Sequence, residues 1–410
     1  MKHKLQSKKI IMPPLETQLT ADDIETKYYC DYLLSEKKNY SVSRVSYIDG
    51  FSEVDLPVAI AYRPNSKVLS QSAGKGISRN QSLISALMES YECDAAEKVK
   101  PDHHLISESY LKENNLKFIS PELLSITLSS YRKHMCIEWC EGQNILSKQK
   151  CLVPFHAVSL DFTLMAKPDY SAHMQLTSNG LASGKSREQA TVSALYEIIE
   201  RHSITSHEID NLERSKLVDI LSIPSEIQIQ LIDKIVSPDI NIFIYDVTVW
   251  EEFPTYACHI VDNIGFYNVG WGCHVDPAIS LARAVTEANQ ARTIQISGSR
   301  EDMNKYDYFN LKRKNVAANT SDFSQYVNYR SRVYMNNPDS IQISELIFQY
   351  RGVDPVAICV DERKDMSVVR VVTPKLHGYN YPAYRSMLSN SFKESILGFE
   401  LQPTHKPAAG

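Results

Sequence analysis

The sequence contains no apolar run that approaches the roughly 20 residues needed to cross a bilayer. Its basic N-terminus, M-K-H-K-L-Q-S-K-K-I-I-M-P-P, lacks the apolar stretch of a secretory signal peptide. The net charge of −5 gives no general case for binding to nucleic acid or to a membrane surface. These absences predict a cytoplasmic protein with neither kind of partner.

The sequence also lacks a recognisable cysteine framework. Eight cysteines are scattered along the chain, and only Cys136, Cys140 and Cys151 cluster, at a spacing unlike that of paired zinc knuckles. One interpretation is a zinc site completed by His134 and His156. The other, which fits most free thiols, is that these cysteines are small apolar core residues.

The Walker motif G-x-x-x-x-G-K-[ST] is missing as well. Gly184-Lys185-Ser186 ends like that motif, but Asn179 occupies the position of its first glycine. If the protein binds a nucleotide, it must do so by another arrangement.

What the sequence does contain is a helical pattern that begins at Ser186. Gln189 follows three residues later, which is the signature of a capping box. Ser193, Glu197 and Glu200 then recur at helical spacing, so a hydroxyl and two carboxylates lie along one face. Because two carboxylates on one face repel each other, we expect positive charge beside them.

The same pattern occurs three times in the chain. Each copy has a cap residue eleven positions before its first glutamate, and each is preceded by a glycine-containing turn. The face residues of the three copies are Ser85, Glu89 and Glu92; Ser193, Glu197 and Glu200; and Arg283, Glu287 and Gln290. Three turn–helix units in register predict that the three helices converge on one site, although a single copy would most simply be a solvated helix face.

Five carboxylates in one site require cations or protonation, because close like charges cannot all stay ionised unpaired. Hard oxygen ligands suit Mg²⁺, which takes one or two protein carboxylates together with waters and phosphate oxygens. Helix N-termini after glycine-containing turns suit phosphates. The cations that could face a polyphosphate are Lys75, Lys185, Arg201, Arg292 and Arg300. The residues therefore predict a magnesium–nucleotide site.

Three motifs in this order resemble the YcaO domain. They are S-A-G-K-G-I-S…S-A-L-M-E-S-Y-E, S-N-G-L-A-S-G-K-S-R-E-Q-A…S-A-L-Y-E-I-I-E-R and G-C-H-V-D-P…R-A-V-T-E-A-N-Q-A-R. The resemblance is dense over residues 56–300 and extends over 40–375. It implies an α+β YcaO-like fold with mixed or antiparallel sheets and three helices around an ATP–Mg²⁺ site.

The resemblance also implies a reaction and roles for residues. YcaO enzymes use ATP to phosphorylate a peptide backbone amide oxygen, which a nucleophile then replaces. The expected magnesium ligands are Glu89, Glu92, Glu197 and Glu200. The expected nucleotide-binding residues are Lys75, Ser85, Ala182, Lys185, Gln189, Ser193, Arg201, Glu287, Gln290 and Arg292. Arg201 and Arg292 are the expected catalytic residues.

The sequence departs from the family pattern at three places. Cys93 stands where the family often has arginine, and Lys185 stands where asparagine is common. Azoline-forming members commonly end in Pro-x-Pro-x-Pro, whereas here Pro403 and Pro407 precede a terminal Ala-Ala-Gly. The last departure weakens the case for azoline formation and strengthens the case for thioamide formation.

Several functions are therefore open. The first is azoline-forming cyclodehydration of Cys, Ser or Thr in a ribosomally made precursor peptide, the commoner chemistry of the family. The alternatives are thioamide formation, a non-catalytic accessory role in modifying a ribosomal protein, and a simple ATP-dependent ligase. The expected partners are the precursor peptide, an E1-like leader-binding protein or a TfuA-type protein, and a dehydrogenase, within a homodimer or hetero-oligomer.

The chain is expected to divide into an N-terminal arm (1–40), a catalytic domain (41–375) and a C-terminal tail (376–410). Paired strands rather than regular β–α alternation favour an α+β class. Helices are predicted at 21–34 and 120–129, with a polar helical segment from 202 to 236. Strands are predicted at 42–49, 56–64, 134–138, 152–161, 240–248, 254–262, 356–361 and 366–374.

Overall fold

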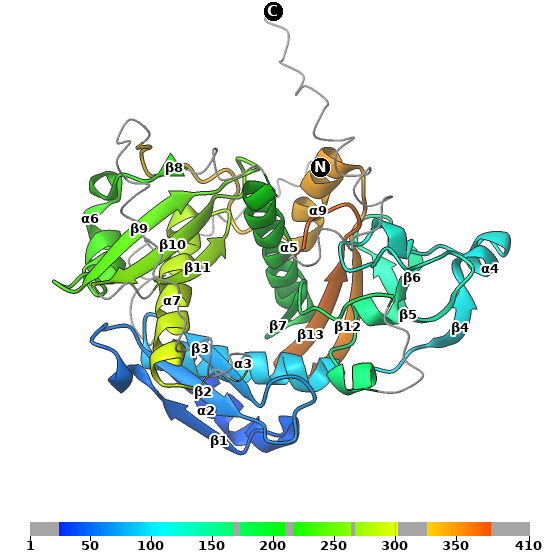
Figure 1. Cartoon of the computed structure of the whole chain (residues 1–410), viewed down its shortest axis with the longest axis horizontal. Helices are drawn as coiled ribbons and strands as arrows, with labels where there is room; N and C mark the ends of the chain where they lie inside the picture. Colours follow the sequence, from blue (N-terminus) through cyan, green and yellow to red (C-terminus); the bar gives the residue numbers. More distant parts are fainter. Residues whose placement is uncertain are drawn as a thin grey trace, which may run out of the picture.

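Three antiparallel sheets organise the chain in the computed structural model (Figure 1). The structure describes residues 24–166, 173–209, 216–263, 267–299, 301 and 326–378. The strand orders are β1-β2-β3, β11-β10-β9-β8 and β4-β5-β12-β13-β7, with β6 added beside β5. The strands are β1 (Arg44–Tyr47), β2 (Val58–Tyr62), β3 (Gln71–Lys75), β4 (His103–Ser107), β5 (Cys136–Asn144), β6 (Lys150–Pro154), β7 (Leu181–Gly184), β8 (Lys216–Leu217), β9 (Ile240–Asp246), β10 (Thr255–Asp262), β11 (Tyr267–Cys273), β12 (Val356–Arg363) and β13 (Met366–Val372).

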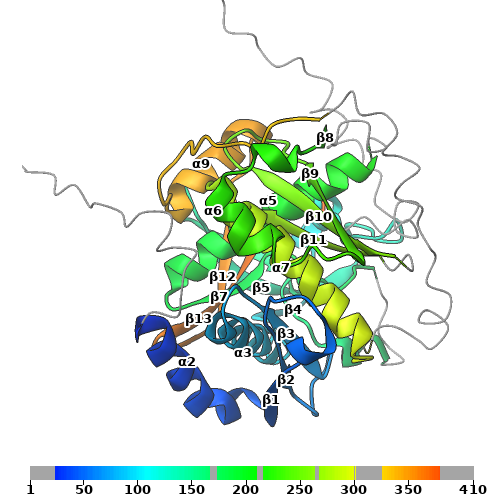
Figure 2. The ribbon, with the colours of Figure 1, turned by 90° about the vertical axis from the view of Figure 1, so that its left-hand side faces the viewer.

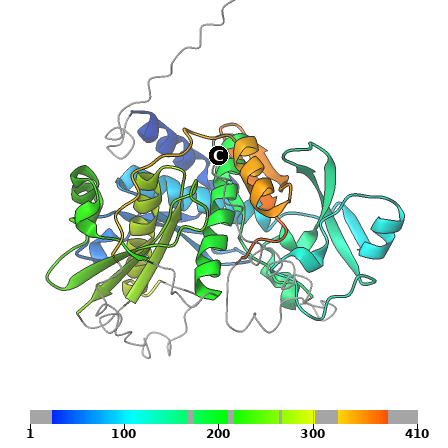
Figure 3. The same cartoon turned by 90° about the horizontal axis from the view of Figure 1, so that it is seen from above.

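Helices α3, α5 and α7 stand between and against these sheets. Figure 1 shows α5 between the sheet that contains β9–β11 and the sheet that contains β12 and β13, with α3 below it. Seen from above, α9 lies beside α5 (Figure 3). The helices are α2 (Ile24–Glu36), α3 (Arg79–Ala96), α4 (Glu108–Glu113), α5 (Arg187–Ile209), α6 (Ser225–Ile227), α7 (Pro277–Ile296) and α9 (Ser340–Arg351). The predicted α+β class is confirmed by this mixture of helices and antiparallel sheets.

The three predicted turn–helix units each consist of an edge strand and the helix that follows it. Strands β3, β7 and β11 end their sheets, and α3, α5 and α7 pack back across them. A Cβ atom at Gly74 would lie 2.0 Å from the carbonyl oxygen of Ser82, and one at Gly272 would lie 2.1 Å from that of Ser280. These glycines were predicted to serve phosphate binding, but the structure shows that glycine is required for the helix to cross its own strand closely.

The predicted caps begin all three helices. The hydroxyl of Ser78 accepts a hydrogen bond from the backbone N–H of Gln81, and the hydroxyl of Ser186 accepts one from Gln189, both at 3.2 Å. Asp276 caps α7 with its carboxylate, which accepts from a backbone N–H in the first turn. Each cap satisfies a donor that the helix leaves open and fixes where the helix begins.

The predicted apolar stripe of α5 faces the core. Leu195, Ile198 and Ile199 are buried against β13 and α9, while Val192 is half-buried at the edge of the same cluster. Burial of each large aliphatic side chain contributes about 1.5–3 kcal/mol. The stripe therefore fixes the rotation of α5 and turns its carboxylate face away from the core.

Two predicted elements differ from the structure around the six-stranded sheet. The helix predicted at 120–129 is wrong: only a single 3₁₀ turn, Pro121–Leu123, forms there. The Thr127 hydroxyl donates to the carbonyl of Pro121 at 2.6 Å, and this turn geometry competes with a helix. The strand predicted at 152–161 ends at Pro154, where a 3₁₀ turn (Phe155–Ala157) begins.

The predicted helical segment at 202–236 is correct only in part. Helix α5 continues to Ile209, and residues 210–215 lie outside the described residues. Beyond them the chain forms the short strand β8, the single turn α6 and a π-helical turn at Gln228–Ile232. Pro224 begins α6 and separates it from what precedes, because proline ends a helix on its N-terminal side.

Helix α9 was not predicted, although its sequence carries a full capping box. The Asp339 carboxylate accepts from the backbone N–H of Gln342, and the Gln342 side chain accepts from the backbone of Asp339. Gly352 ends the helix at φ +65°. The capping box is a helix-start signal and Gly352 is a stop signal, so the helix was predictable. No helix was predicted because the sequence before it is polar and Asn-rich.

The remaining predicted elements are confirmed with small shifts. Helix α2 and strands β1, β2, β5, β9, β10, β12 and β13 occupy their predicted segments. The expected tail is described only to residue 378, so most of it lies outside the described residues. The division at residues 40 and 375 stays a prediction. In the described part of the chain, no helix is both long and apolar enough to span a membrane.

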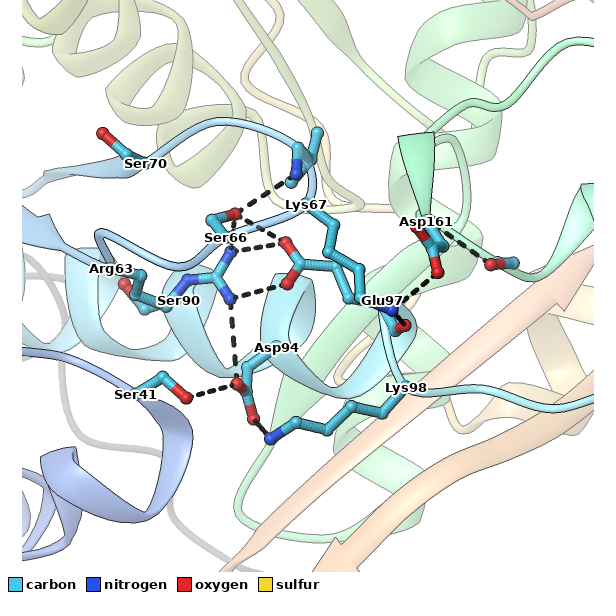
Figure 4. A network of polar contacts seen from close by, with 12 residues as sticks. Ser41, Arg63, Ser66, Lys67, Ser70, Ser90, Asp94, Glu97, Lys98 and Asp161 are labelled. Carbon is cyan, nitrogen blue, oxygen red and sulfur yellow. Dashed lines mark hydrogen bonds and ion pairs between the residues drawn. The ribbon is translucent and has the colours of Figure 1, made fainter. Parts of the chain in front are cut away.

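A buried ionic network fixes the C-terminal half of α3 from behind (Figure 4). Arg63, 1% exposed, contacts the carboxylate of Glu97 at 2.9 Å and that of Asp94 at 3.8 Å. Ser66 donates to Glu97 at 2.6 Å and accepts from Arg63 at 2.8 Å. Lys67 extends the network to Asp161 at 2.6 Å. Because α3 carries two of the predicted metal ligands, this network sets their position.

Replacing Arg63 should destabilise the protein strongly. Arg63→Met leaves two buried carboxylates without their guanidinium, which costs about 3–5 kcal/mol. Chemical denaturation monitored by circular dichroism measures this loss. The exposed partner of the same network serves as the control: Lys98→Met should cost less than about 1 kcal/mol. Equal effects of the two changes would contradict the structural role given to Arg63.

Candidate magnesium–nucleotide site

The three turn–helix units and α2 surround a cavity of about 720 Å³. Twelve of the predicted site residues line it: Lys75, Ser85, Glu89, Glu92, Ala182, Lys185, Gln189, Ser193, Glu197, Glu200, Arg201 and Glu287. These residues come from three segments that are distant in the sequence. The predicted convergence of the three units on one site is thus what the structure shows.

Two predicted residues are not brought to this cavity. Gln290 donates from its side chain to the carbonyl of Ala73. Arg292 is buried and contacts Glu53 at 3.2 Å and Asp262 at 3.9 Å. Arg292 follows Glu287 by five positions, so the helix turns it away from the face that Glu287 presents. Gln290, three positions on, stays near that face but is engaged by the Ala73 carbonyl.

Several residues that line the cavity had no predicted role. Arg283 was predicted on the converging face, at the register position of Ser85 and Ser193, but not as a binding residue. Trp271 lies in β11, between the two glycines of the third predicted turn, which the structure shows to be a strand. Ser183 and the α2 residues carried no comparable signal. Arg300, considered as a further cation, lies outside the described residues.

The two carboxylates of α3 are held in an environment that disfavours their charge. Desolvation by the surrounding protein raises the pKa of Glu89 to about 7, although its side chain is exposed to the cavity. Desolvation also raises the pKa of Glu92 to about 7, and the neighbouring Glu89 charge adds to the effect. Ser183 opposes it by donating to Glu92 from its backbone N–H at 2.8 Å and its hydroxyl at 2.6 Å.

The carboxylates of α5 behave in the same way. Desolvation raises the pKa of Glu197 to about 8 and raises that of Glu200 as well. The guanidinium of Arg201 lies 4.0 Å from Glu197 and 3.7 Å from Glu200 and lowers both values in part. Burial would also raise the pKa of Glu287, but Lys75 and Arg201 outweigh it and hold the value below its usual range. Lys75 is in direct ionic contact with Glu287.

This donor set fits a hard divalent cation. The carboxylates disfavour one another's charge and sit where water cannot fully solvate them, so bound cations would stabilise their ionised form. Within the described ranges, no three His, Cys, Asp or Glu side chains lie close enough to hold one ion between them. In proteins Mg²⁺ usually takes one or two carboxylates and completes its shell with water and phosphate oxygens.

Cations share the cavity with these carboxylates. Arg201 lies 6.0 Å from the ring centroid of Trp271, and Arg283 lies 5.9 Å from that of Tyr196. Stacking against aromatic rings orients a guanidinium while leaving its N–H groups able to donate. The cavity therefore combines ligands for a metal ion with donors for phosphate oxygens.

The clustered cysteines lie away from this cavity. Cys136 is exposed, whereas Cys140 and Cys151 are buried. Burial raises the pKa of Cys140 to about 12 and that of Cys151 to about 11, so both thiols stay protonated at neutral pH. Cys140 and Cys151 pack in an apolar core cluster with Trp139 and Val153, as expected for small core residues.

This chain is similar to known proteins in sequence and in fold. A family model described as "YcaO cyclodehydratase, ATP- and Mg²⁺-binding" matches residues 73–377. An uncharacterized protein in the tfuA 3′ region of Rhizobium leguminosarum bv. trifolii is 29% identical over 287 residues, which is 67% of each chain.

Two solved structures share the fold at low sequence identity. The YcaO protein from Methanopyrus kandleri, bound with AMPPCP and Mg²⁺, superposes with a TM-score of 0.67 at 20% identity over 89% of this chain and 93% of that one. A heterocyclase in complex with substrate and cofactor gives a TM-score of 0.69 at 20% identity over 85% of this chain. This chain spans about half, 52%, of that heterocyclase chain. The predicted fold is confirmed by these likenesses.

The raised pKa values predict how stability depends on pH without metal. An unfolded glutamate titrates near about 4.3, so a folded-state pKa of about 7 to 8 means that the fold prefers the protonated carboxyl. Each such carboxyl stabilises the fold fully at pH values below its pKa in the unfolded chain. This stabilisation is lost as the pH rises through the pKa of the carboxyl in the folded protein. The metal-free protein should therefore melt at a lower temperature at about pH 9 than at about pH 6.

Glu197→Gln isolates this effect from other titrating groups. The variant keeps a neutral group at every pH, so its melting temperature should fall less than that of the wild type between the same two pH values. Mg²⁺ should also reduce the fall in the wild type, because it replaces protons on the carboxylates. Equal pH slopes for variant and wild type would contradict the environment described for Glu197.

Proposed function

The chain belongs to the YcaO family, and from that premise we propose that it is an enzyme that uses ATP and Mg²⁺ to phosphorylate a peptide backbone amide oxygen. The cofactor prediction, ATP and Mg²⁺, agrees with the family description. The observation that carries the proposal is the single cavity where Glu89, Glu92, Glu197 and Glu200 meet Lys75 and other cations. Carboxylates for a metal ion and cations for phosphates are the two requirements of phosphoryl transfer.

The carboxylates of α3 and α5 would hold Mg²⁺. When bound, the metal supplies charge neutralisation at the phosphate oxygens. Glu92 is already oriented by its two hydrogen bonds from Ser183, so one ligand of the set is fixed before the metal arrives. Arg201 lies beside Glu197 and Glu200 and would offset their charge until the cation binds.

The cations would position the nucleotide. Lys75 and Arg283 line the cavity from β3 and α7, and Arg201 lines it from α5. Planar guanidinium groups donate in pairs to phosphate oxygens, which fixes their orientation as well as their charge. Transfer of the γ-phosphoryl group to the amide oxygen would release ADP, and a nucleophile would then displace phosphate from the amide carbon.

Two nucleophiles are compatible with this site. A neighbouring Cys, Ser or Thr side chain would give an azoline, and the heterocyclase with the same fold supports this branch only through its architecture. External sulfide would give a thioamide. The relative in the tfuA region supports the second branch, with a TfuA-type protein as partner. We propose thioamide formation as the second candidate on that observation.

The partners follow from the chemistry proposed. The peptide whose amide is to be activated must be presented to the cavity. We therefore propose a precursor peptide as substrate and an E1-like or TfuA-type protein that presents it. A dehydrogenase would act after azoline formation, because it oxidises the ring that the first reaction leaves. A homodimer or a hetero-oligomer would bring these components together.

Loss of one metal ligand should abolish turnover. Glu197→Gln or Glu200→Gln should reduce peptide-dependent ADP release by at least about 100-fold, since even residues that only support metal ligands cost 10–100-fold. Phosphate release in the presence of peptide and partner measures this. Glu113→Gln, at an exposed position of α4, is the matched control and should keep wild-type turnover. Wild-type turnover in either site variant would contradict the metal assignment.

Mass spectrometry of the peptide product distinguishes the chemistries. Azoline formation removes water from the peptide, whereas thioamide formation exchanges an oxygen atom for sulfur and requires a sulfide source. If saturating peptide and partner never raise ATP turnover above background, the accessory role replaces both azoline formation and thioamide formation. Ligation of a free carboxylate to an amine without any ribosomal peptide would instead support the ligase.

A further inference from the structure

Helix α2 lines the cavity although it lies outside the residues that match the family model. The match begins at residue 73, whereas Thr26 and Tyr29 of α2 are among the cavity-lining residues. Figure 2 shows α2 beside α3, near β13. This chain therefore adds a wall to the site that the family match alone does not include.

The body of α2 is fixed independently of the cavity. Tyr29 and Tyr32 donate from their hydroxyls to the backbone carbonyls of Asp365 and Lys364, at 3.1 and 2.6 Å. Leu33 is fully buried in the cluster that includes α3. Tyr32 and Leu33 do not line the cavity, so the contacts that these two residues make hold α2 in place whatever the cavity contains.

Two contacts link α2 to a cavity cation. The Lys185 ammonium lies 2.8 Å from the Glu25 carboxylate and 4.6 Å from the ring centroid of Tyr29. Lys185 also lines the cavity, and its backbone N–H is fixed by the side chain of Gln189 at 2.9 Å. The backbone of Lys185 is therefore held in place while its side chain, at the cavity wall, is engaged by α2.

The pair between Lys185 and Glu25 is weak enough to exchange. Their side chains are 41% and 78% exposed, so water screens the attraction. A phosphate group carries more negative charge than one carboxylate and offers several acceptor oxygens. A lysine with a flexible stem can turn from one acceptor to the other without moving its backbone.

We propose that Glu25 competes with the phosphates of the bound nucleotide for the Lys185 ammonium. Lys185 leaves Glu25 when the nucleotide enters, so α2 sets the nucleotide affinity of this chain through a residue that stands where the family commonly has asparagine. This inference rests on the proposed function, because it takes the cavity to bind a nucleotide. It assigns a role in setting nucleotide affinity to Glu25, which lies on a helix outside the matched region.

Competition predicts that neutralising Glu25 tightens nucleotide binding. If Glu25 instead helped Lys185 to bind the nucleotide, the same change would weaken binding. Glu25→Gln should tighten binding of a non-hydrolysable ATP analogue with Mg²⁺ by about two- to fivefold, because it frees Lys185. Lys185→Asn should weaken binding, because it removes the cation. In the double variant, Glu25→Gln should have no further effect. Isothermal titration calorimetry on the full chain measures all three dissociation constants.

Two matched controls separate this exchange from general charge effects. Asp31→Asn makes the same change of charge elsewhere on α2, and Arg187→Asn removes a cation from α5 that pairs with Glu362 and does not line the cavity. Both should bind the analogue as the wild type does. A Glu25→Gln effect of equal size in the Lys185→Asn background, or weaker binding in Glu25→Gln alone, would overturn the proposal.

The outcome also separates this inference from the proposed function. If the wild type and Arg187→Asn bind the analogue but Glu25 has no effect, only the competition is wrong. If neither protein binds the analogue with Mg²⁺, the proposed function fails, and the inference fails with it.

Discussion

Repulsion among the carboxylates of the cavity is the constraint on which the structure depends. Glu89, Glu92, Glu197 and Glu200 gain nothing from one another, and desolvation raises the pKa of each. They are held together by contacts made elsewhere: the apolar stripe of α5 and the Arg63 network behind α3. The fold supplies the stability that the site itself lacks, which is the usual relation between a scaffold and a charged functional site.

The repeated strand–helix unit explains how three distant segments reach one cavity. In each unit the helix crosses its own edge strand closely, and a glycine such as Gly74 leaves the room for that crossing. The strand fixes the helix, and the helix presents its polar face beyond the sheet edge. Three such edges meet around the cavity, so metal ligands and phosphate donors come from separate, rigid elements. That separation allows carboxylates and cations to be close without neutralising each other completely.

The sequence predicted the features that follow a period and missed those that depend on long-range contacts. The caps at Ser78, Ser186 and Asp276 and the carboxylate faces follow helical spacing, so they were predictable. Arg292 shares the same helix as Glu287, but only the structure shows it paired with Glu53 and Asp262. The contribution of α2 could not be foreseen either, since its contact with Lys185 joins segments about 160 residues apart in a way that no local pattern encodes.

The position of the bound metal shows whether the glutamates of α3 and α5 are its ligands. A crystal structure grown with Mn²⁺ in place of Mg²⁺ and with a non-hydrolysable ATP analogue would locate the metal by its anomalous signal. We expect the metal to be bound directly by carboxylate oxygens of α3 or α5. Metal held away from Glu89, Glu92, Glu197 and Glu200 would contradict this expectation.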